Sequence, residues 1–426
     1  MPYEPYFITA ADLAARGAAD IPAELQTDTN LIYNSPAALD FNSPGAQGFG
    51  VKRAGLAIPD SIMLLISPGC CGRNTRAIAA ADKFGERFAY LLLDENDIVT
   101  GKHLKKIPEA VAAFVKSRPA KPSCVMLCIT CVDALLGTDM ERVCRKASQK
   151  VNLPVLPSYM YALTRDSRRP PMTAIRKTVY SLLKPAEKNP AAVNLLGFFA
   201  PLQDSELFKI LNKLGIKQVN ELAKTKNMAE YQQLATANFN LILNPETREA
   251  ADFMAKALAI PSIELKRLYQ IDKIAAQYKG LANVLGMTIN DTSYYEQAQK
   301  TIDKFVAKHS KLRLAIGSRL NANSFELALA MASYGLTVDE IYAVPQKADF
   351  FYIKRLGVLS PATKIFTNLS PSMVNFNPLN SQVNFTLGAD ANYYYPAING
   401  ISWNDEQQPF GYQAVIDLFN RMEEVL

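Results

Sequence analysis

Histidine, tryptophan and long apolar runs are scarce in this chain of 426 residues, which carries two histidines and one tryptophan. No apolar run reaches the roughly 20 residues that a membrane-spanning helix needs. The N-terminus, Met1-Pro2-Tyr3-Glu4, lacks the basic and then apolar order of a secretory signal peptide. The net charge of +6 is small for this length, and the lysines are dispersed. We therefore expect a cytoplasmic protein that binds neither a membrane nor nucleic acid.

Cysteine is confined to the first third of the sequence. The six cysteines are Cys70, Cys71, Cys124, Cys128, Cys131 and Cys144. Because cytoplasmic thiols stay reduced, a group of cysteines indicates a metal or redox site more than a set of disulfides. Beyond residue 144 the sequence has no cysteine, and His309 is its only histidine there.

Apolar, β-rich runs alternate with amphipathic helical segments, which is the pattern of parallel βαβ units. The predicted fold class is α/β, with three Rossmann-like domains whose parallel sheets are flanked by helices. The polar, proline-bracketed stretch 184–190 marks a boundary, and the expected domains are 1–187, 188–310 and 311–426. The main expected strands are 61–66, 88–93, 123–129, 154–158, 192–198, 238–243, 262–265, 313–318 and 338–344. The main expected helices are 171–183, 205–214, 247–258, 272–285, 294–309 and 325–334.

Three of the cysteines are interpreted as packing residues. Segment 124–131 has the Cys-x3-Cys-x2-Cys spacing of the radical S-adenosylmethionine motif. A strand at 123–129 would hold Cys124 and Cys128 about 13 Å apart, which is too far for one small cluster. Cys144 falls on the apolar face of a helix that begins with the capping box Thr138-x-x-Glu141.

The other three, Cys70, Cys71 and Cys131, each follow a predicted parallel strand, in the turn where open α/β sheets bind ligands. Gly69 and Gly72 flank the first pair and allow the backbone to approach a bulky group closely. Thiolates on neighbouring strand ends can converge on one iron–sulfur centre. We weigh this metal site above the alternative, a pair of buried and inert thiols.

The segments around these cysteines resemble the nitrogenase component 1 family. They are residues 67–72 (SPGCCG), 128–139 (CITCVDALLGTD), 259–263 (AIPSI) and 408–415 (QPFGYQAV). The resemblance implies a three-domain fold, a second component-1-type subunit, and an ATP-hydrolysing iron protein as electron donor. It also implies that Cys131 and either Cys71 or Cys70 hold an iron–sulfur cluster of the [4Fe-4S] type that is shared between subunits.

This sequence departs from the family pattern at positions that bear on the cluster type and on the reaction. No cysteine stands in 41–55, where the family's earliest ligand is expected, so the thiolates present fit a [4Fe-4S] cluster better than a larger one. Asp133 stays open as an oxygen ligand. Because only His309 is left for a second metal site, we do not expect dinitrogen reduction. No phosphate-binding Gly-x4-Gly-Lys-Ser/Thr motif occurs, so ATP hydrolysis is assigned to the partner.

Three functions stay open. The first is an oxidoreductase subunit that acts on an organic small-molecule substrate, the second is a scaffold for metallocluster assembly, and the third is a metal-free protein that binds a small ligand. The arginines of 164–171 (TRDSRRPP) would suit an anionic substrate or an acidic partner as well as a solvated loop. The tyrosines of 392–396 (NYYYP) favour packing between domains over a pocket lining. His103 is expected at the surface.

Overall fold

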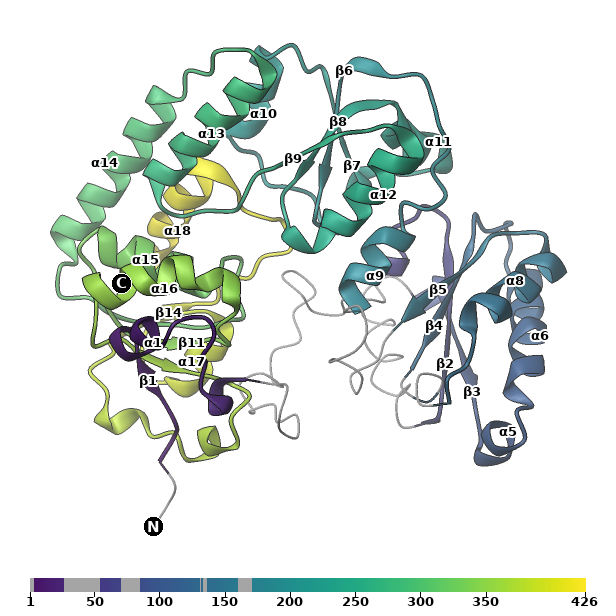
Figure 1. Cartoon of the computed structure of the whole chain (residues 1–426), viewed down its shortest axis with the longest axis horizontal. Coiled ribbons are helices and arrows are strands. Elements are labelled where there is room, and N and C mark those ends of the chain that lie inside the picture. The colour runs from purple at the N-terminus through teal and green to yellow at the C-terminus, as the bar shows by residue number, and fades with distance from the viewer. Residues whose placement is uncertain (1–3, 27–53, 70–84, 131, 133–135, 160–170) are drawn as a thin grey trace. The chain divides into compact units, whose positions relative to one another are not determined.

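The structure is a computed structural model of the whole chain, and it describes residues 4–26, 54–69, 85–130, 132, 136–159 and 171–426. The described residues form three sheets and fall into two compact units. One unit comprises Ala200–Gly215 and Lys266–Leu426 with the N-terminal segment, and the other comprises the described part of 54–199 with Ile216–Leu265. The predicted fold class is confirmed, since parallel sheets are flanked by helices (Figure 1).

The first sheet along the chain is parallel and has the order β3-β2-β4-β5. Its strands are β2 (Ile62–Ser67), β3 (Phe88–Leu92), β4 (Val125–Ile129) and β5 (Val155–Tyr159). Each lies within two residues of its predicted range. The central strands β2 and β4 are buried at every position, because apolar side chains cover both faces of a parallel sheet.

The helices that follow these strands are α5 (Glu95–Val99), α6 (His103–Lys116), α8 (Met140–Val151) and α9 (Pro171–Thr178). In α8 the buried face includes Cys144, as predicted. The predicted capping box at Thr138 is wrong, because the side chain of Asp139 accepts the Arg142 N–H and caps the helix. An aspartate caps as well as a threonine and adds a favourable charge at the helix start.

The same unit contains a second parallel sheet, of order β7-β6-β8-β9. Its elements are β6 (Asn189–Leu196), β7 (Gln218–Glu221), α11 (Met228–Gln233), β8 (Ala237–Ile242), α12 (Arg248–Leu258) and β9 (Ser262–Glu264). The side chain of Arg176, on α9, links that helix to segments that follow strands of the second sheet. Its buried guanidinium donates to the Gly197 carbonyl, pairs with Glu246, and lies 4.8 Å from the Phe199 ring centroid.

The other unit is built on a six-stranded sheet of order β1-β12-β11-β10-β13-β14. Its strands are β1 (Ile8–Thr9), β10 (Arg313–Ile316), β11 (Thr337–Tyr342), β12 (Lys364–Phe366), β13 (Phe385–Leu387) and β14 (Gly400–Ile401). Only β1 is antiparallel among these described strands, and it pairs with β12. The N-terminal segment therefore lies with the C-terminal sheet, a long-range pairing that the sequence pattern did not indicate.

Eight helices of the described residues belong to the same unit as this sheet. They are α1 (Ala10–Arg16), α10 (Glu206–Lys213), α13 (Ile271–Leu285), α14 (Thr292–Lys308), α15 (Ser324–Ser333), α16 (Phe350–Leu359), α17 (Ala389–Tyr394) and α18 (Gly411–Val425). No helix in the described parts of the chain is both long and apolar enough to cross a bilayer.

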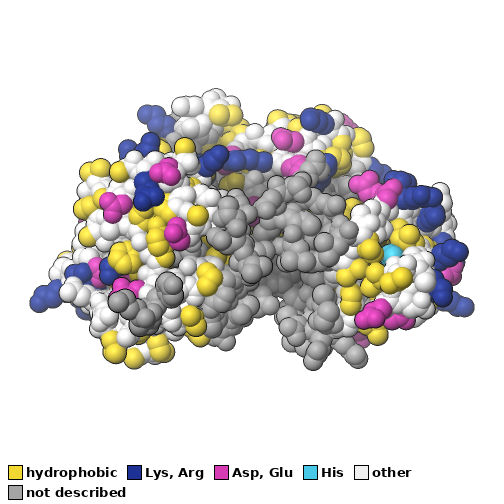
Figure 2. All heavy atoms as spheres, turned by 60° about the horizontal axis from the view of Figure 1, so that its bottom comes forward, with side chains coloured by type: hydrophobic (Ala, Val, Ile, Leu, Met, Phe, Trp, Pro, Cys, Tyr) yellow, Lys and Arg dark blue, Asp and Glu magenta, His cyan; other side chains and the backbone are white. Residues whose placement is uncertain are grey.

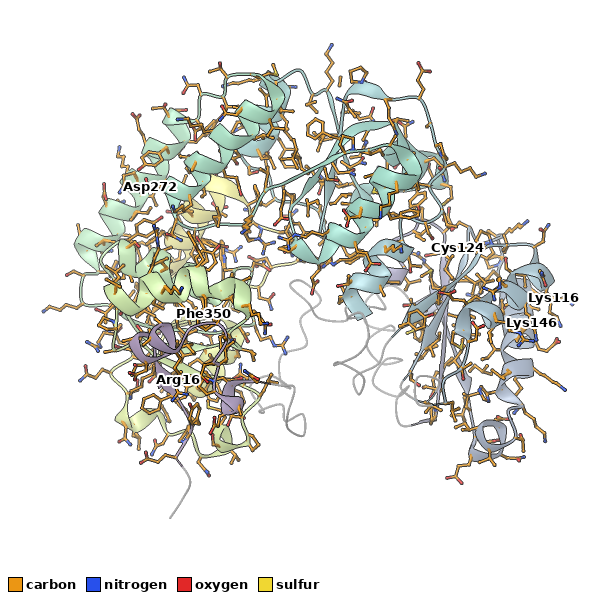
Figure 3. The ribbon with its side chains drawn as sticks, in the orientation of Figure 1. Arg16, Lys116, Cys124, Lys146, Asp272 and Phe350 are labelled. Carbon is orange, nitrogen blue, oxygen red and sulfur yellow. The ribbon has the colours of Figure 1, made fainter. Side chains whose placement is uncertain are left out.

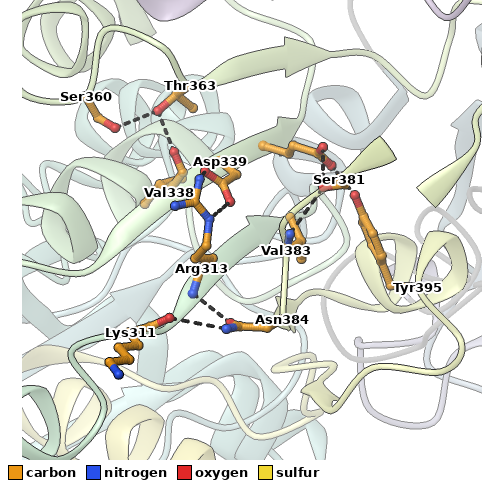
Figure 4. A network of polar contacts seen from close by, with 11 residues as sticks. Lys311, Arg313, Val338, Asp339, Ser360, Thr363, Ser381, Val383, Asn384 and Tyr395 are labelled. Atoms are coloured by element: carbon orange, nitrogen blue, oxygen red, sulfur yellow. Dashed lines mark hydrogen bonds and ion pairs between the residues drawn. The ribbon is translucent and has the colours of Figure 1, made fainter. Parts of the chain in front are cut away.

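Polar contacts fix the register of the six-stranded sheet. Arg313 of β10 makes a two-point ion pair with Asp339 of β11, with N–O distances of 2.7 and 2.6 Å (Figure 4). The Thr363 hydroxyl donates to the Val338 carbonyl at 2.7 Å in the same network. These contacts tie neighbouring strands together near their amino ends.

The tyrosines of 392–396 pack within this unit. Tyr394 stacks on Tyr342, with ring centroids 4.7 Å apart, and the Tyr395 hydroxyl donates to the Glu340 carboxylate at 2.5 Å. Tyr393 is 43% exposed. The interpretation of Tyr394 and Tyr395 as packing between domains is therefore wrong, because the C-terminal sheet supplies the polar partner that a buried phenol needs.

Candidate metal centre

Strands β2 and β4 end side by side at one edge of the first sheet, just before the segments that carry the predicted ligands. The strands are parallel neighbours, and Ile66 is paired with Ile129 at their carboxyl ends. The turns that begin after Ser67 and Ile129 therefore leave the sheet side by side. Strands of this sheet are about 4.8 Å apart, which is within the span of a small cluster.

The predicted ligands themselves, Cys70, Cys71 and Cys131, lie outside the described residues, as do Gly72 and Asp133. Their meeting at one metal centre stays a prediction. Gly69 is described, and a Cβ atom built there would meet only Leu92 Cδ1, at 3.6 Å. That distance is an ordinary contact, so space at this position does not by itself demand glycine.

One face of the first sheet becomes polar toward this edge. Side chains alternate between the two faces of a strand, so Ser67, Thr130 and Ser158 continue the rows of Leu65, Cys128 and Leu156 on a single face. In strand order the hydroxyl row is Tyr90, Ser67, Thr130 and Ser158, and it is staggered. Tyr90 is paired with Leu65 and Ser158 with Cys128, whereas Ser67 and Thr130 come two residues later in their own segments. The sequence analysis missed it, because a hydroxyl in a predicted strand carries no signal of its own.

The two halves of the hydroxyl row differ in their hydrogen bonds. The Tyr90 hydroxyl lies 3.0 Å from Ser67 Oγ and donates to the Pro68 carbonyl at 2.5 Å. Thr130 is 1% exposed and Ser158 is 0% exposed, yet neither hydroxyl has a hydrogen-bond partner within the described structure. A buried hydroxyl left without a partner costs about 1–3 kcal/mol. The unpartnered hydroxyl oxygens of Thr130 and Ser158 therefore fit a site that binds a polar ligand.

The other three cysteines lie in the apolar core, which confirms their interpretation as packing residues. Cys124 immediately precedes β4, at the opposite end from the cysteine-bearing turn (Figure 3). Burial raises the pKa of the Cys124 and Cys144 thiols to about 12. A protonated thiol is a poor metal ligand, so these residues are unsuited to hold iron.

Neither histidine is free to serve as a ligand. His103 is 3% exposed, and its Nδ1 lies 3.0 Å from the Asp97 carbonyl oxygen, so the expectation of a surface residue is wrong. The Nε2 atom of His309 lies 2.7 Å from the Glu423 carboxylate, and its ring packs on Phe305. In the described ranges no three Cys, His, Asp or Glu side chains are arranged to hold a metal ion.

The carboxyl edge of the six-stranded sheet carries a second polar cluster. Asp390 is buried, and its carboxylate accepts the backbone N–H groups of Ser318 and Arg319 at 2.8 and 3.0 Å. It thereby fixes the turn after β10. Nearby, Asn321 Oδ1 and both side-chain polar atoms of Asn404 are buried and lack partners among the residues described. Ordered water or a small polar ligand would satisfy them.

This chain belongs to the nitrogenase component 1 type oxidoreductase family. The family match covers residues 46–343, which include both cysteine-bearing turns and all of the first two sheets. The resemblance carried by the cysteine motifs is thereby confirmed.

Curated relatives include nitrogenase iron-molybdenum cofactor biosynthesis proteins NifE. The protein of Rippkaea orientalis is 26% identical over 53% of this chain and 46% of its own length. That of Mesorhizobium japonicum is 30% identical over 46% of this chain and 43% of its own length. The chain thus spans about half the length of the curated relatives it matches.

Solved structures support the fold independently of these motifs. The structure described as "Nitrogenase Cp1 at pH 6.5" matches with a TM-score of 0.68 and 13% identity, over 97% of this chain and 96% of the other. At that identity the likeness establishes the fold alone. It extends to the C-terminal residues beyond the family match.

Proposed function

We propose that this chain is an iron–sulfur subunit of a nitrogenase-like oxidoreductase, which passes low-potential electrons to an organic substrate other than dinitrogen. The observation that carries the proposal is the in-register pairing of β2 with β4. That pairing puts the carboxyl ends of β2 and β4 side by side, which supports a site formed by the cysteine-bearing segments that follow them. Members of this family generally bind iron–sulfur clusters, which fits the softness of thiolate ligands.

In this proposal Cys131 and either Cys71 or Cys70 hold the cluster. When bound, a [4Fe-4S] cluster supplies one-electron transfer at low potential. The chain has thiols for a single cluster only, because Cys124, Cys128 and Cys144 are buried in its core. With so few ligands per chain, a cluster shared with a second component-1-type subunit is the simplest arrangement.

Exposed apolar side chains near the same edge support a partner surface. Leu92 is the last residue of β3, and Val99 and Leu104 follow that strand; they are 57%, 85% and 40% exposed. Leu136, in the loop after β4, is 49% exposed. Hydrophobic side chains are visible on this side of the body at the right of Figure 2. The family resemblance implies an ATP-hydrolysing iron protein as electron donor. The absence of a phosphate-binding loop motif from the sequence fits ATP hydrolysis by such a partner.

A second candidate function is a scaffold for metallocluster assembly. It is favoured by the similarity of this chain to NifE proteins, which are cofactor biosynthesis proteins. In that case the cluster would be cargo that leaves the protein. The two candidates share the same cysteine site and differ in the fate of the cluster.

The first experiment compares anaerobic absorption and electron paramagnetic resonance spectra of the reconstituted wild type and single-cysteine variants. Cys71→Ala, Cys70→Ala and Cys131→Ala test the ligands, and Cys124→Ala and Cys128→Ala are the matched controls. We expect loss of the cluster spectrum with Cys131→Ala and with one member of the 70–71 pair. Loss with the controls, and retention with Cys131→Ala, would overturn the ligand assignment.

The second experiment follows the cluster after it is loaded. Incubation with an ATP-dependent iron protein tests for reduction of the bound cluster, and incubation with an apo-acceptor tests for its departure. Repeated reduction and reoxidation with the iron content unchanged supports the oxidoreductase. Quantitative loss of iron to the acceptor, without electron transfer, supports the scaffold and contradicts the leading proposal.

A further inference from the structure

In the hydroxyl row of the first sheet, Tyr90 and Ser67 have hydrogen-bond partners, whereas Thr130 and Ser158 have none in the described structure. Tyr90 and Ser67 satisfy each other, with help from the Pro68 carbonyl. Thr130 directly follows β4 and Ser158 lies in the adjacent strand β5, and both hydroxyls are buried without a partner in the described structure. The unsatisfied pair is therefore a local feature of the β4–β5 side, toward the carboxyl ends of those strands.

Packing alone does not account for this pair. On the same face Ser158 is paired with Cys128, and Met126 is paired with Leu156 two residues further back. These three apolar side chains belong to or pack against one hydrophobic core. Valine or alanine would complete that core without an unmet hydrogen bond. Two buried hydroxyls on one face, offset by two residues on adjacent chain segments, instead indicate a polar group that both contact in the functional protein.

We propose that Thr130 and Ser158 donate hydrogen bonds to sulfur atoms of the iron–sulfur cluster, with Thr130 making the stronger contact because it directly precedes Cys131. This inference rests on the proposed cluster at that cysteine. Hydrogen bonds to cluster sulfur stabilise the more negative, reduced state and so raise the reduction potential. The two hydroxyls would therefore set how readily the cluster accepts an electron.

The test compares Thr130→Val with Thr130→Ser in the full-length, anaerobically reconstituted protein. The valine variant keeps the shape and removes the donor, whereas the serine variant keeps the donor. Potentials are measured by electron paramagnetic resonance during redox titration. For Thr130→Val we expect about a tenfold lower ratio of reduced to oxidised cluster at a fixed potential, a shift of about 59 mV for a one-electron couple. Thr130→Ser should stay near the wild type.

Thr247→Val is the matched control. Thr247 is 1% exposed, and its hydroxyl also lacks a partner in the described ranges, but it follows β8 of the second sheet. Ser158→Ala is the second variant and should shift the potential in the same direction as Thr130→Val. Circular dichroism and thermal unfolding of the cluster-free proteins confirm that each variant folds.

The outcomes separate this inference from the proposed function. If the wild type binds no cluster, the proposed function fails and this inference fails with it. If the wild type binds a cluster and Thr130→Val has the same potential as the wild type and Thr247→Val, the proposed function stands and the hydroxyls contact only water. A shift with Thr130→Val alone, rescued by Thr130→Ser, supports the inference for Thr130 and removes Ser158 from it.

Discussion

Glu326 is a carboxylic acid buried on all sides at the start of α15. Its oxygens accept the backbone N–H of Tyr269 at 3.0 Å and that of Gln270 at 3.1 Å. Burial raises its pKa from 4.5 to about 7, although these hydrogen bonds oppose the rise. The carboxyl group therefore keeps its proton in the folded protein at pH values where the unfolded chain has lost it.

The pH dependence of stability follows from this difference. Between about pH 4.5 and 7 the folded state binds more protons than the unfolded state, so the free energy of unfolding falls as pH rises. The loss attributable to Glu326 is on the order of 3 kcal/mol across that window. Glu326→Gln should remove it, since the amide keeps an acceptor oxygen and does not ionise.

Urea unfolding of the wild type and Glu326→Gln from pH 5 to 7.5 measures this effect. We expect the variant to gain stability relative to the wild type as pH rises. Glu296→Gln, on the exposed side of α14, removes the same charge from the surface and serves as the control. A constant difference between wild type and Glu326→Gln across the pH range would contradict the assignment.

Thiol reactivity gives a second test at the residue scale. At pH 8 a thiol with a pKa of about 12, as at Cys124 and Cys144, is roughly one ten-thousandth thiolate, against about a quarter for a free cysteine. Both residues should resist iodoacetamide in the folded protein and react fully in urea. Peptide mass spectrometry after timed labelling measures both rates. Labelling of Cys124 in the folded state as fast as in urea would show that the core around it is open.

Individual side chains were predictable from the sequence only where a periodic pattern governs them. Cys144 was placed in the core because neighbouring apolar residues recur at helical spacing. His103 was placed at the surface, and this was wrong because its burial depends on a backbone carbonyl of another helix, Asp97 O. The unsatisfied hydroxyls of Thr130 and Ser158 depend on the pairing of strands, so they could not be predicted from the sequence.

At the scale of elements, α18 is held at its first turn by a buried carboxylate. Glu206 of α10 accepts the Tyr412 N–H at 2.7 Å and the Tyr278 hydroxyl at 2.7 Å, so it joins α10, α13 and α18. Gly411 makes this approach feasible. Its φ is +69°, and a Cβ atom there would lie 1.8 Å from Glu206 Oε1.

Gly411→Ala should therefore destabilise the protein by about 3–5 kcal/mol, from backbone strain together with the displaced hydrogen bonds. Gly286→Ala is the control, because Gly286 has a φ of +63° and no atom within 4 Å of an added Cβ. It should cost about 1–2 kcal/mol from strain alone. Urea unfolding midpoints compare the two. Equal losses would show that the Glu206 contact contributes little.

The regular elements were predicted more accurately than the single residues. Strands β2 to β5 lie within two residues of their expected ranges, because each is a short apolar run between turn residues. The order β3-β2-β4-β5 places the carboxyl ends of β2 and β4 at one edge, and the meeting of the cysteines there stays a prediction. Strand β1 was missed, since two residues form no pattern and its partner, β12, is far away in the sequence.

At the scale of the whole molecule, the iron content of the reconstituted protein tests whether one cluster is shared. A [4Fe-4S] cluster held between two copies of this chain gives about two iron atoms per chain, and a cluster held by one chain gives about four. We expect about two, with assembly into a dimer that appears only after iron and sulfide are added. Anaerobic size-exclusion chromatography with iron and protein analysis of each fraction measures both quantities.

Cys131→Ala supplies the control for this assembly, since it removes a proposed ligand and leaves the apolar side chains of Leu92 and Val99 in place. If those side chains alone drive pairing, the variant dimerises without iron, and the cluster is not needed to hold the subunits together. If cluster ligation drives pairing, the variant stays monomeric and a chelator returns the wild type to monomers. Four iron atoms per monomeric chain would contradict a shared cluster, and this chain would then have to supply every ligand itself.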